Sequence, residues 1–417
     1  MQMIAPRCYS SIWRHTTCFR IQARPRWGGC MFSTESTKGR HYGRSFGLSG
    51  AGFLGSYHVG VLACLFKQGL VPDPRLDPPA EAMPFITGVS AGSMVAAATF
   101  AGVEPAEDGM NVVLEAARKT RELTASKQTR LPITISLDVF TPGFSLIDIV
   151  EGYFREVLAK SLGGYCETDQ GNKNIRDVDP GLFARRFPKG RLRIGLTDRR
   201  ELLLPLPLPV SRQLSSSYKY VDEFRDLEDV VSCAMLSSYI PGVTGQFNVQ
   251  IPPRMTNLSN SESATGDRSD VSIRSGLRLE EMEREGLVKH GTSGEPVSNS
   301  AGACQTNQIS NYWDGGIADL FPTFDGNTIV VTPLSGRFHT NPAICPELLP
   351  PSGMGHKPVT FRHCAKSELG LTSGNALSVM QMIFSSSDEE LISKFKEGYD
   401  DASRFLREQG GSKVLTI

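Results

Sequence analysis

A short apolar strand followed by a glycine-containing turn and a helix occurs twice near the start of the chain. Residues 44–48 form the first strand, which leads through a glycine loop into a helix-like run that stops at Gly69. Residues 85–89 form the second, which leads through GVSAGS into an alanine-rich run. Short buried strands that alternate with helices are typical of layered α/β folds. The sequence therefore predicts an α/β fold with a mainly parallel central sheet.

Later segments continue this alternation. Apolar spacing and capping residues predict further helices at about 106–128, 145–160, 223–238 and 388–408, and strands at 192–198 and 327–333. The chain is accordingly divided into a leader at 1–41, a main domain at 42–345 and a C-terminal extension at 346–417, which carries the last helix.

Charge and cysteine content argue against several classes of protein. The charges of the 44 basic and 44 acidic residues cancel, so the chain has no net positive charge that would favour nucleic-acid binding. The nine cysteines form no CxxC pair, and no Cys/His cluster has metal-ligand spacing. Residues 46–66 lack charge, but their glycines and His58 favour a buried strand, loop and helix over a membrane span. We expect a reducing compartment, no metal and no nucleic-acid partner.

The first 34 residues differ in composition from the rest. They contain five arginines and no acidic residue, with Ser, Thr and aromatic residues between them. Such a leader resembles an organelle transit peptide. A disordered basic tail and an incorrectly assigned start site are the alternatives.

Residues 255–310 are rich in polar residues and contain ten serines. Their apolar content predicts a disordered insertion at the surface of the main domain. Ser269, Ser272 and Ser275 lie near arginines in the sequence, which suggests a linker controlled by phosphorylation.

The loop at 47–55, GLSGAGFLG, has two interpretations. It contains GxGxxG, which in a dinucleotide-binding fold precedes an acidic ribose ligand by about 20 residues. Asp73 and Asp77 lie near that distance, but in a proline-rich loop rather than at a strand end. Backbone N–H groups at the start of a helix would bind a phosphate or a transient oxyanion equally well.

A serine and an aspartate supply the remaining groups for acyl transfer. Ser90 follows a strand and is flanked by Gly88 and Gly92, which a sharp strand-to-helix turn requires. Asp314 follows a short apolar stretch and precedes two glycines. Together with the glycine loop, these residues provide a nucleophile, a base and an oxyanion site.

A Ser–acid–His triad is the alternative arrangement. His339, His356 and His363 follow Asp314 and so have the required order, but they lie in loop-like segments where histidine is usually solvated. His58 lies within the first helix and is interpreted as a packing or surface residue.

These motifs, with their order, resemble those of the patatin-like phospholipases, and within that family the adipose triglyceride lipase branch. The resemblance covers about residues 42–345 and rests on SFGLSGAGFLGSYHVGV (45–61), GVSAGS, SSYIPG (237–242), YWDGGIADLFP (312–322) and PLSG (333–336). It implies a three-layer α/β/α fold with a Ser–Asp dyad, no catalytic histidine and no cofactor.

Carried over by position, the resemblance makes Ser90 the nucleophile and Asp314 its general base. Backbone N–H groups of Gly50, Ala51 and Gly52 would form the oxyanion hole. Ala51 departs from the three consecutive glycines of many plant members, but it still offers an N–H group.

Aspartate, with an ordinary pKa of about 3.9, is a poor base at neutral pH unless it is desolvated. The apolar neighbours Trp313, Ile317 and Leu320 are expected to do this. Candidates for the acyl-chain site are Phe53, Leu54, Met94, Ile240 and Phe321, and the apolar run at 202–210 is a candidate lipid-docking segment.

The resulting expectation is a lipase that releases fatty acids from acylglycerols through an acyl-enzyme. Phospholipase A-type hydrolysis by the same dyad, a catalytically silent lipid-surface scaffold and a nucleotide-dependent oxidoreductase are the alternatives. The expected substrate is an acylglycerol or phospholipid at a lipid-droplet or membrane surface, with a protein co-activator as a further candidate partner. The expected location is the cytoplasm at such a surface, with organelle import if the leader is a transit peptide.

Overall fold

The computed structural model describes residues 45–76, 78–125, 145–167, 173–175, 178–202, 217–241, 243–245, 271–291, 311–348, 359–364 and 367–410. The chain divides into two units, 1–40 and 41–417, and every described residue belongs to the second. The expected leader at 1–41 therefore lies outside the described residues, as does nearly all of the apolar run at 202–210.

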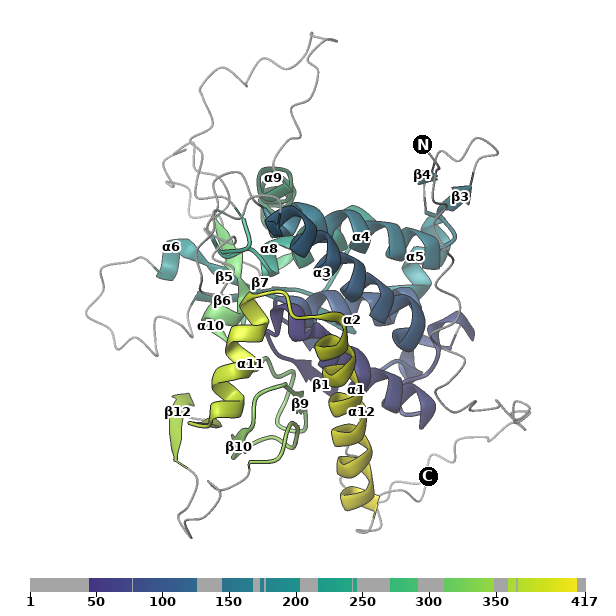
Figure 1. Cartoon of the computed structure of the whole chain (residues 1–417). Coiled ribbons are helices and arrows are strands. Elements are labelled where there is room, and N and C mark those ends of the chain that lie inside the picture. Colours follow the sequence, from purple (N-terminus) through teal and green to yellow (C-terminus); the bar gives the residue numbers. More distant parts are fainter. Residues whose placement is uncertain are drawn as a thin grey trace, which may run out of the picture. The chain divides into compact units, whose positions relative to one another are not determined.

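An eight-stranded sheet is the centre of the second unit (Figure 1). Its order is β11-β9-β1-β2-β5-β6-β7, and β8 pairs with β5 outside this path. Strands β11, β9, β1, β2 and β5 run parallel, whereas β6 and β8 pair antiparallel with β5, and β7 antiparallel with β6. The strands are β1 Ser45–Leu48, β2 Phe85–Gly88, β5 Leu192–Asp198, β6 Tyr218–Val221, β7 Val288–His290, β8 Tyr312–Asp314, β9 Ile329–Val331 and β11 Ala343–Ile344.

Helices flank this sheet in a three-layer α/β/α arrangement, so the predicted fold class is confirmed (Figure 1). Helix α1 packs against α12. Helices α2 and α8 contact the central sheet, and α4 packs against both of them. The helices are α1 Gly55–Lys67, α2 Ala91–Ala101, α3 Met110–Ala125, α4 Leu146–Ser161, α5 Pro180–Arg186, α6 Arg199–Leu202, α8 Leu227–Ser237, α9 Val271–Arg284, α10 Gly315–Ala318, α11 Ser373–Ile383 and α12 Asp388–Gly410.

Shorter elements connect these layers. Single helical turns are η2 Gly52–Leu54, η3 Pro74–Leu76, η4 Ala80–Ala82 and η5 Pro105–Gly109. Two small antiparallel sheets consist of β3 Tyr165–Glu167 with β4 Lys173–Ile175, and of β10 Gly336–Phe338 with β12 Thr360–Cys364 and β13 Ser367–Gly370.

The core lies between the sheet and its helices. Leu48, Ile86 and Ile194, from adjacent parallel strands, are fully buried, because helices cover both faces of such a sheet. The alanine-rich helix α2 brings its backbone close to the strands, with Ala96 and Ala97 buried against them.

The last helix is an integral part of this unit. Helices α1 and α12 cross so closely that a Cβ atom at Gly60 or Gly398 would overlap the backbone of the other helix. At the same crossing the Tyr57 hydroxyl donates a 2.7 Å hydrogen bond to Asp401. The C-terminal extension expected at 346–417 therefore contributes a helix to the main fold.

The prediction of disorder throughout 255–310 is wrong for residues 271–291. Helix α9 and strand β7 lie there, and β7 is the edge strand of the central sheet. Arg278 of α9 donates a 2.6 Å hydrogen bond to Asp229, a buried carboxylate whose pKa is lowered by Arg225 and Arg278 against the effect of its burial. The remainder of the predicted insertion lies outside the described residues.

The phosphorylation hypothesis is corrected by the same helix. The side chains of Ser272 and Ser275 are buried, so a kinase cannot reach their hydroxyl groups while α9 is folded. Ser269 lies outside the described residues.

The crossing of α1 and α12 predicts a stability effect. Gly398→Ala would place a methyl group 2.2 Å from the Tyr57 carbonyl oxygen, which should lower the free energy of unfolding by about 1–3 kcal/mol. Gly152→Ala on α4 is the matched control, because no atom lies within 4 Å of its Cβ position, and it should raise that energy by up to about 1 kcal/mol. Urea unfolding followed by circular dichroism measures both changes, and equal midpoints for the two variants would contradict the close crossing.

Candidate active site

Ser90 occupies a strained backbone position between β2 and α2. Its φ and ψ are 53° and −135°, and it is the one non-glycine residue with positive φ in the part of the chain that the structure describes. Such a conformation costs on the order of 1–3 kcal/mol and persists where surrounding contacts hold it. Strain of this kind clusters at functional sites, and here it places the serine at the start of a helix.

The glycines on either side of Ser90 leave room for this turn. A Cβ atom at Gly88 would lie 2.5 Å from the carbonyl oxygen of Gly92, and one at Gly92 would lie 2.5 Å from the carbonyl oxygens of Leu48 and Ser49. Strand β1, the turn at Ser90 and α2 thus approach more closely than any larger residue would allow.

Hydrogen bonds to the Ser90 backbone hold the turn. The Ser90 N–H donates to Ser237 Oγ at 2.9 Å, and the Ser237 hydroxyl donates to the carbonyl oxygen of Gly195 at 2.7 Å. The Ser93 hydroxyl donates to the Ser90 carbonyl oxygen at 2.6 Å. No role for Ser237 was evident from the sequence, although SSYIPG (237–242), one of the motifs behind the family resemblance, begins with it.

Asp314 reaches Ser90 because two strands share one edge of β5. Gly88, at the end of β2, pairs with Ile194, and Asp314, at the end of β8, pairs with Leu196. The two strands approach from opposite directions, so their ends meet. Asp314 is fixed there by its N–H, which donates to the Tyr239 carbonyl at 2.9 Å, and by its carbonyl, which accepts from the Thr197 hydroxyl at 2.6 Å.

The carboxylate of Asp314 is buried, and its Oδ1 accepts a hydrogen bond from the Gly316 N–H at 2.7 Å. Burial disfavours the ionised form and raises the pKa of Asp314 to about 7, although the Ser90 side chain and the Gly316 N–H oppose the rise. An aspartate with this pKa can act as a base at neutral pH.

The neighbours that desolvate Asp314 differ in part from those expected. Leu320 lies at the site, because its Cδ1 is 3.1 Å from the Cβ position of Gly50 and 3.6 Å from that of Gly316. Val89 also approaches the Gly316 position. Trp313 instead packs against Arg199, whose guanidinium carbon lies 5.3 Å from the centre of the Trp313 ring. Successive side chains of a strand point to opposite faces of the sheet, so Trp313 and Asp314 point to opposite faces.

The glycine loop presents unpaired N–H groups beside Ser90. A Cβ atom at Gly50 would lie 3.6 Å from that of Ser90. No described residue accepts a hydrogen bond from the backbone N–H of Gly50, Ala51 or Gly52. Gly50 and Ala51 are buried and Gly52 is exposed. Buried N–H groups are rarely left unpaired, so this loop at a helix start is suited to an oxyanion.

Within the described residues, no histidine is hydrogen-bonded to the Ser90 side chain. His339 lies 3.4 Å from Glu368 in the small sheet of β10 and β13. His58 is buried, its Nε2 lies 3.2 Å from the carbonyl oxygen of Val331, and burial lowers its pKa to about 4. His356 and the side chain of His363 lie outside the described part.

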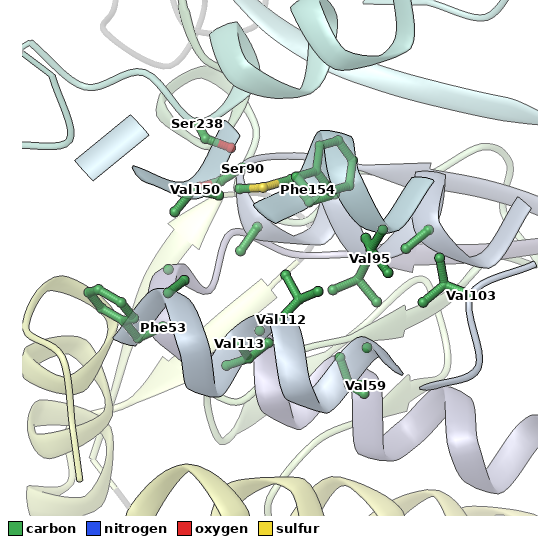
Figure 2. Close-up of a pocket in the computed structure, with 18 of the residues that line it drawn as sticks. Phe53, Val59, Ser90, Val95, Val103, Val112, Val113, Val150, Phe154 and Ser238 are labelled. Carbon is green, nitrogen blue, oxygen red and sulfur yellow. The ribbon is translucent and has the colours of Figure 1, made fainter. Parts of the chain in front are cut away.

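A cavity of about 150 Å³ opens from Ser90 toward α3 and α4 (Figure 2). Phe53 and Met94 line it as expected, whereas Leu54, Ile240 and Phe321 do not. The walls from η5, α3 and α4 were not anticipated, because no local motif marks them. The lining is almost wholly apolar and consists of Gly52, Phe53, Gly55, Val59, Leu62, Ser90, Ala91, Met94, Val95, Ala98, Thr99, Val103, Pro105, Gly109, Val112, Val113, Ala116, Leu146, Ile147, Val150, Phe154, Val157, Ser238 and Thr244.

Other site types find little support in the described residues. No group of three or more potential metal ligands occurs there, and no described helix is long and apolar enough to cross a membrane. Asp73, a candidate ribose ligand, is instead hydrogen-bonded to Arg75. Asp77 lies outside the described residues.

Comparison with known proteins points to one family. The model of the patatin-like phospholipase family matches residues 48–325. Human 1-acylglycerol-3-phosphate O-acyltransferase PNPLA3 is 24% identical over 88% of this chain and 51% of its own length. Rat patatin-like phospholipase domain-containing protein 2 is 23% identical over 87% and 50%, and human patatin-like phospholipase domain-containing protein 4 is 20% identical over 88% and 97%.

The chain thus spans about half the length of the first two relatives and nearly all of the third. No solved structure matches the chain significantly. Because the family model covers more than half of its length, the chain belongs to the patatin-like phospholipase family.

Proposed function

We propose that the chain is a serine acyl hydrolase that releases fatty acids from acylglycerols. The observation that carries this proposal is the meeting of Ser90 and the buried carboxylate of Asp314 at one edge of β5, where burial raises the pKa of Asp314 to about 7. The unpaired N–H groups at 50–52 and the apolar cavity at Ser90 meet the other requirements of ester hydrolysis, an oxyanion site and an acyl site. Family membership supports the hydrolysis of lipid esters in general.

In the proposed reaction, Asp314 accepts the proton of the Ser90 hydroxyl while Oγ attacks the ester carbonyl carbon. The carbonyl oxygen becomes an oxyanion, which accepts hydrogen bonds from the N–H groups of Gly50, Ala51 and Gly52. When this intermediate collapses, the ester C–O bond breaks and the leaving alcohol takes the proton from Asp314. Asp314 then deprotonates a water molecule, which attacks the acyl-enzyme and releases the fatty acid, while the proton returns to Ser90.

The cavity favours a neutral acylglycerol over a phospholipid. None of the described residues that line it is charged, so a fatty acyl chain finds apolar contacts and a phosphate finds no counter-charge among them. One relative is named as an acyltransferase toward 1-acylglycerol-3-phosphate. The same acyl-enzyme would serve that reaction if the hydroxyl of this acceptor replaced water, so transfer is the second candidate.

The proposed location follows from the substrate. Acylglycerols with long acyl chains are insoluble and collect in lipid droplets or membranes, so we place the enzyme at such a surface. The protein co-activator expected from the sequence is a further part of this proposal.

Replacement of the two catalytic residues tests the mechanism. Ser90→Ala and Asp314→Asn should each lower kcat on a soluble ester by at least about 10³-fold, as single dyad or triad losses do. Ser161→Ala, at the end of α4, is the control and should retain full activity. A serine-reactive phosphonate should label wild type and the control but not Ser90→Ala, and labelling of that variant would exclude Ser90 as the nucleophile.

The pKa of Asp314 predicts a pH dependence of activity. Because burial raises this pKa to about 7, kcat/KM should fall about tenfold per pH unit below pH 6, where the base is protonated. A profile that stays level down to pH 5 would show that no base with this pKa takes part.

The same pKa predicts the opposite trend for stability. The unfolded chain releases the Asp314 proton near pH 4 and the folded chain near pH 7, so ionisation of this group lowers the free energy of unfolding as pH rises between them. Asp314→Asn should therefore stabilise the protein by a few kcal/mol at pH 8 and by less at pH 5. Urea unfolding at the two pH values measures this, and an equal change at both would contradict the raised pKa.

The bridge through Ser237 predicts a positioning effect. Ser237→Ala leaves the Ser90 N–H without its partner and should lower kcat about 10- to 100-fold, with little change in KM. Ser232→Ala on the same helix is the matched control, since Ser232 is also buried and is not part of the bridge from Ser90 through Ser237 to Gly195. If Ser237→Ala lowers thermal stability but leaves kcat unchanged, the role of Ser237 is structural and the positioning effect is contradicted.

A further inference from the structure

Helix α11 exposes a cluster of large apolar side chains. Five of the eight large hydrophobic residues that are exposed in the described part of the chain gather on it or beside it, namely Val359, Leu371, Leu377, Val379 and Met380, and we call them the α11 face. Val359 belongs to this group because its carbonyl oxygen accepts a 2.8 Å hydrogen bond from the Leu371 N–H. Leu371 and Leu377 are each about 60% exposed.

The exposure of this face follows from the way α11 is anchored. Ser378 is buried and Met382, four residues on, packs inward against Ala51, Leu54 and Ala91. The Asn375 side chain donates 2.8 Å hydrogen bonds to the carbonyl oxygens of Ser335 and Gly370. One side of α11 is therefore fixed to the domain, and Leu377 and Met380, three residues apart, lie on the other.

This face lacks the charges that normally cover an exposed helix. No Asp, Glu, Lys or Arg occurs from residue 369 to residue 387, in a chain with 21% charged residues. Transfer of this segment into an apolar phase therefore requires no desolvation of a charge. A patch of apolar side chains on a convex helix suits a lipid surface, which needs apolar area alone, whereas a stable protein interface needs about 800 Å² per partner with matched hydrogen bonds.

The α11 face is also connected to the catalytic site. Helix α11 contacts η2, and the Met382 carbonyl oxygen lies 2.0 Å from where a Cβ atom of Gly52 would be. Gly52 and Phe53 of η2 line the same cavity as Ser90, so η2 connects α11, which carries the face, to the acyl site (Figures 1 and 2).

We propose that the α11 face is the surface through which this protein docks on a neutral-lipid surface, with the acyl cavity held next to it. This inference rests on the proposed function for the choice of substrate, but the docking itself requires no catalysis. The apolar side chains of the face enter the lipid interface, and η2 links them to the oxyanion loop.

Flotation of the full chain with triacylglycerol droplets coated by phosphatidylcholine tests the docking. Leu377→Glu/Met380→Glu places two carboxylates on the α11 face and should lower the bound fraction at least tenfold. The matched control is Leu76→Glu/Leu277→Glu, which changes two leucines outside the face that are at least as exposed as Leu377 and Met380, and it should bind as wild type does. Equal binding of both double variants, or no binding of wild type, would overturn the proposal.

Two further measurements separate the alternatives. Hydrolysis of emulsified triacylglycerol, relative to hydrolysis of a soluble ester, should fall at least tenfold in the α11 variant. If wild type hydrolyses neither substrate yet floats and the variant does not, docking stands and the proposed function fails. If gel filtration shows that wild type is an oligomer and the α11 variant is a monomer, the face binds a second copy of the chain and the lipid proposal is overturned.

Discussion

The pairing of two strand ends along one edge of β5 is the constraint on which the rest of the site depends. Strand β2 ends at Gly88 and β8 ends at Asp314, opposite residues that are two apart in β5. The same strand supplies the carbonyl of Gly195, which fixes the Ser90 backbone through Ser237, and the hydroxyl of Thr197, which fixes Asp314. One strand, β5, therefore sets the distance between Ser90 and Asp314.

Burial of Asp314 raises the pKa of its carboxyl group and also lowers the stability of the fold. The carboxylate is desolvated in the folded chain, and its raised pKa makes it a base suited to neutral pH without a histidine. Ionisation of a buried carboxyl opposes folding, and the strained φ of Ser90 adds to that effect. The large apolar core around the parallel strands offsets both terms.

Sequence patterns predicted most helices and strands correctly. They missed helix α9 because the composition was averaged over too long a segment. The helix expected at 145–160 is α4, and the one expected at 388–408 is α12, because each has a sustained apolar face. Residues 255–310 contain ten serines, and this average concealed the apolar Val271, Leu279 and Met282, which become buried when α9 packs on α8. A helix stabilised mainly by tertiary packing gives only a weak local signal.

The sequence by itself determined the local geometry of this protein. Gly88, Ser90 and Gly92 specify a sharp turn, and the loop at 50–52 specifies a helix start with free N–H groups, because both depend on the space around a few neighbouring residues. Only the tertiary structure decided the approach of Asp314 to Ser90, the pKa of Asp314, the walls of the apolar cavity and the exposure of the α11 face. Each of these arises from contacts between segments far apart in the chain, and the physical reason is that burial and strand pairing are properties of the whole fold.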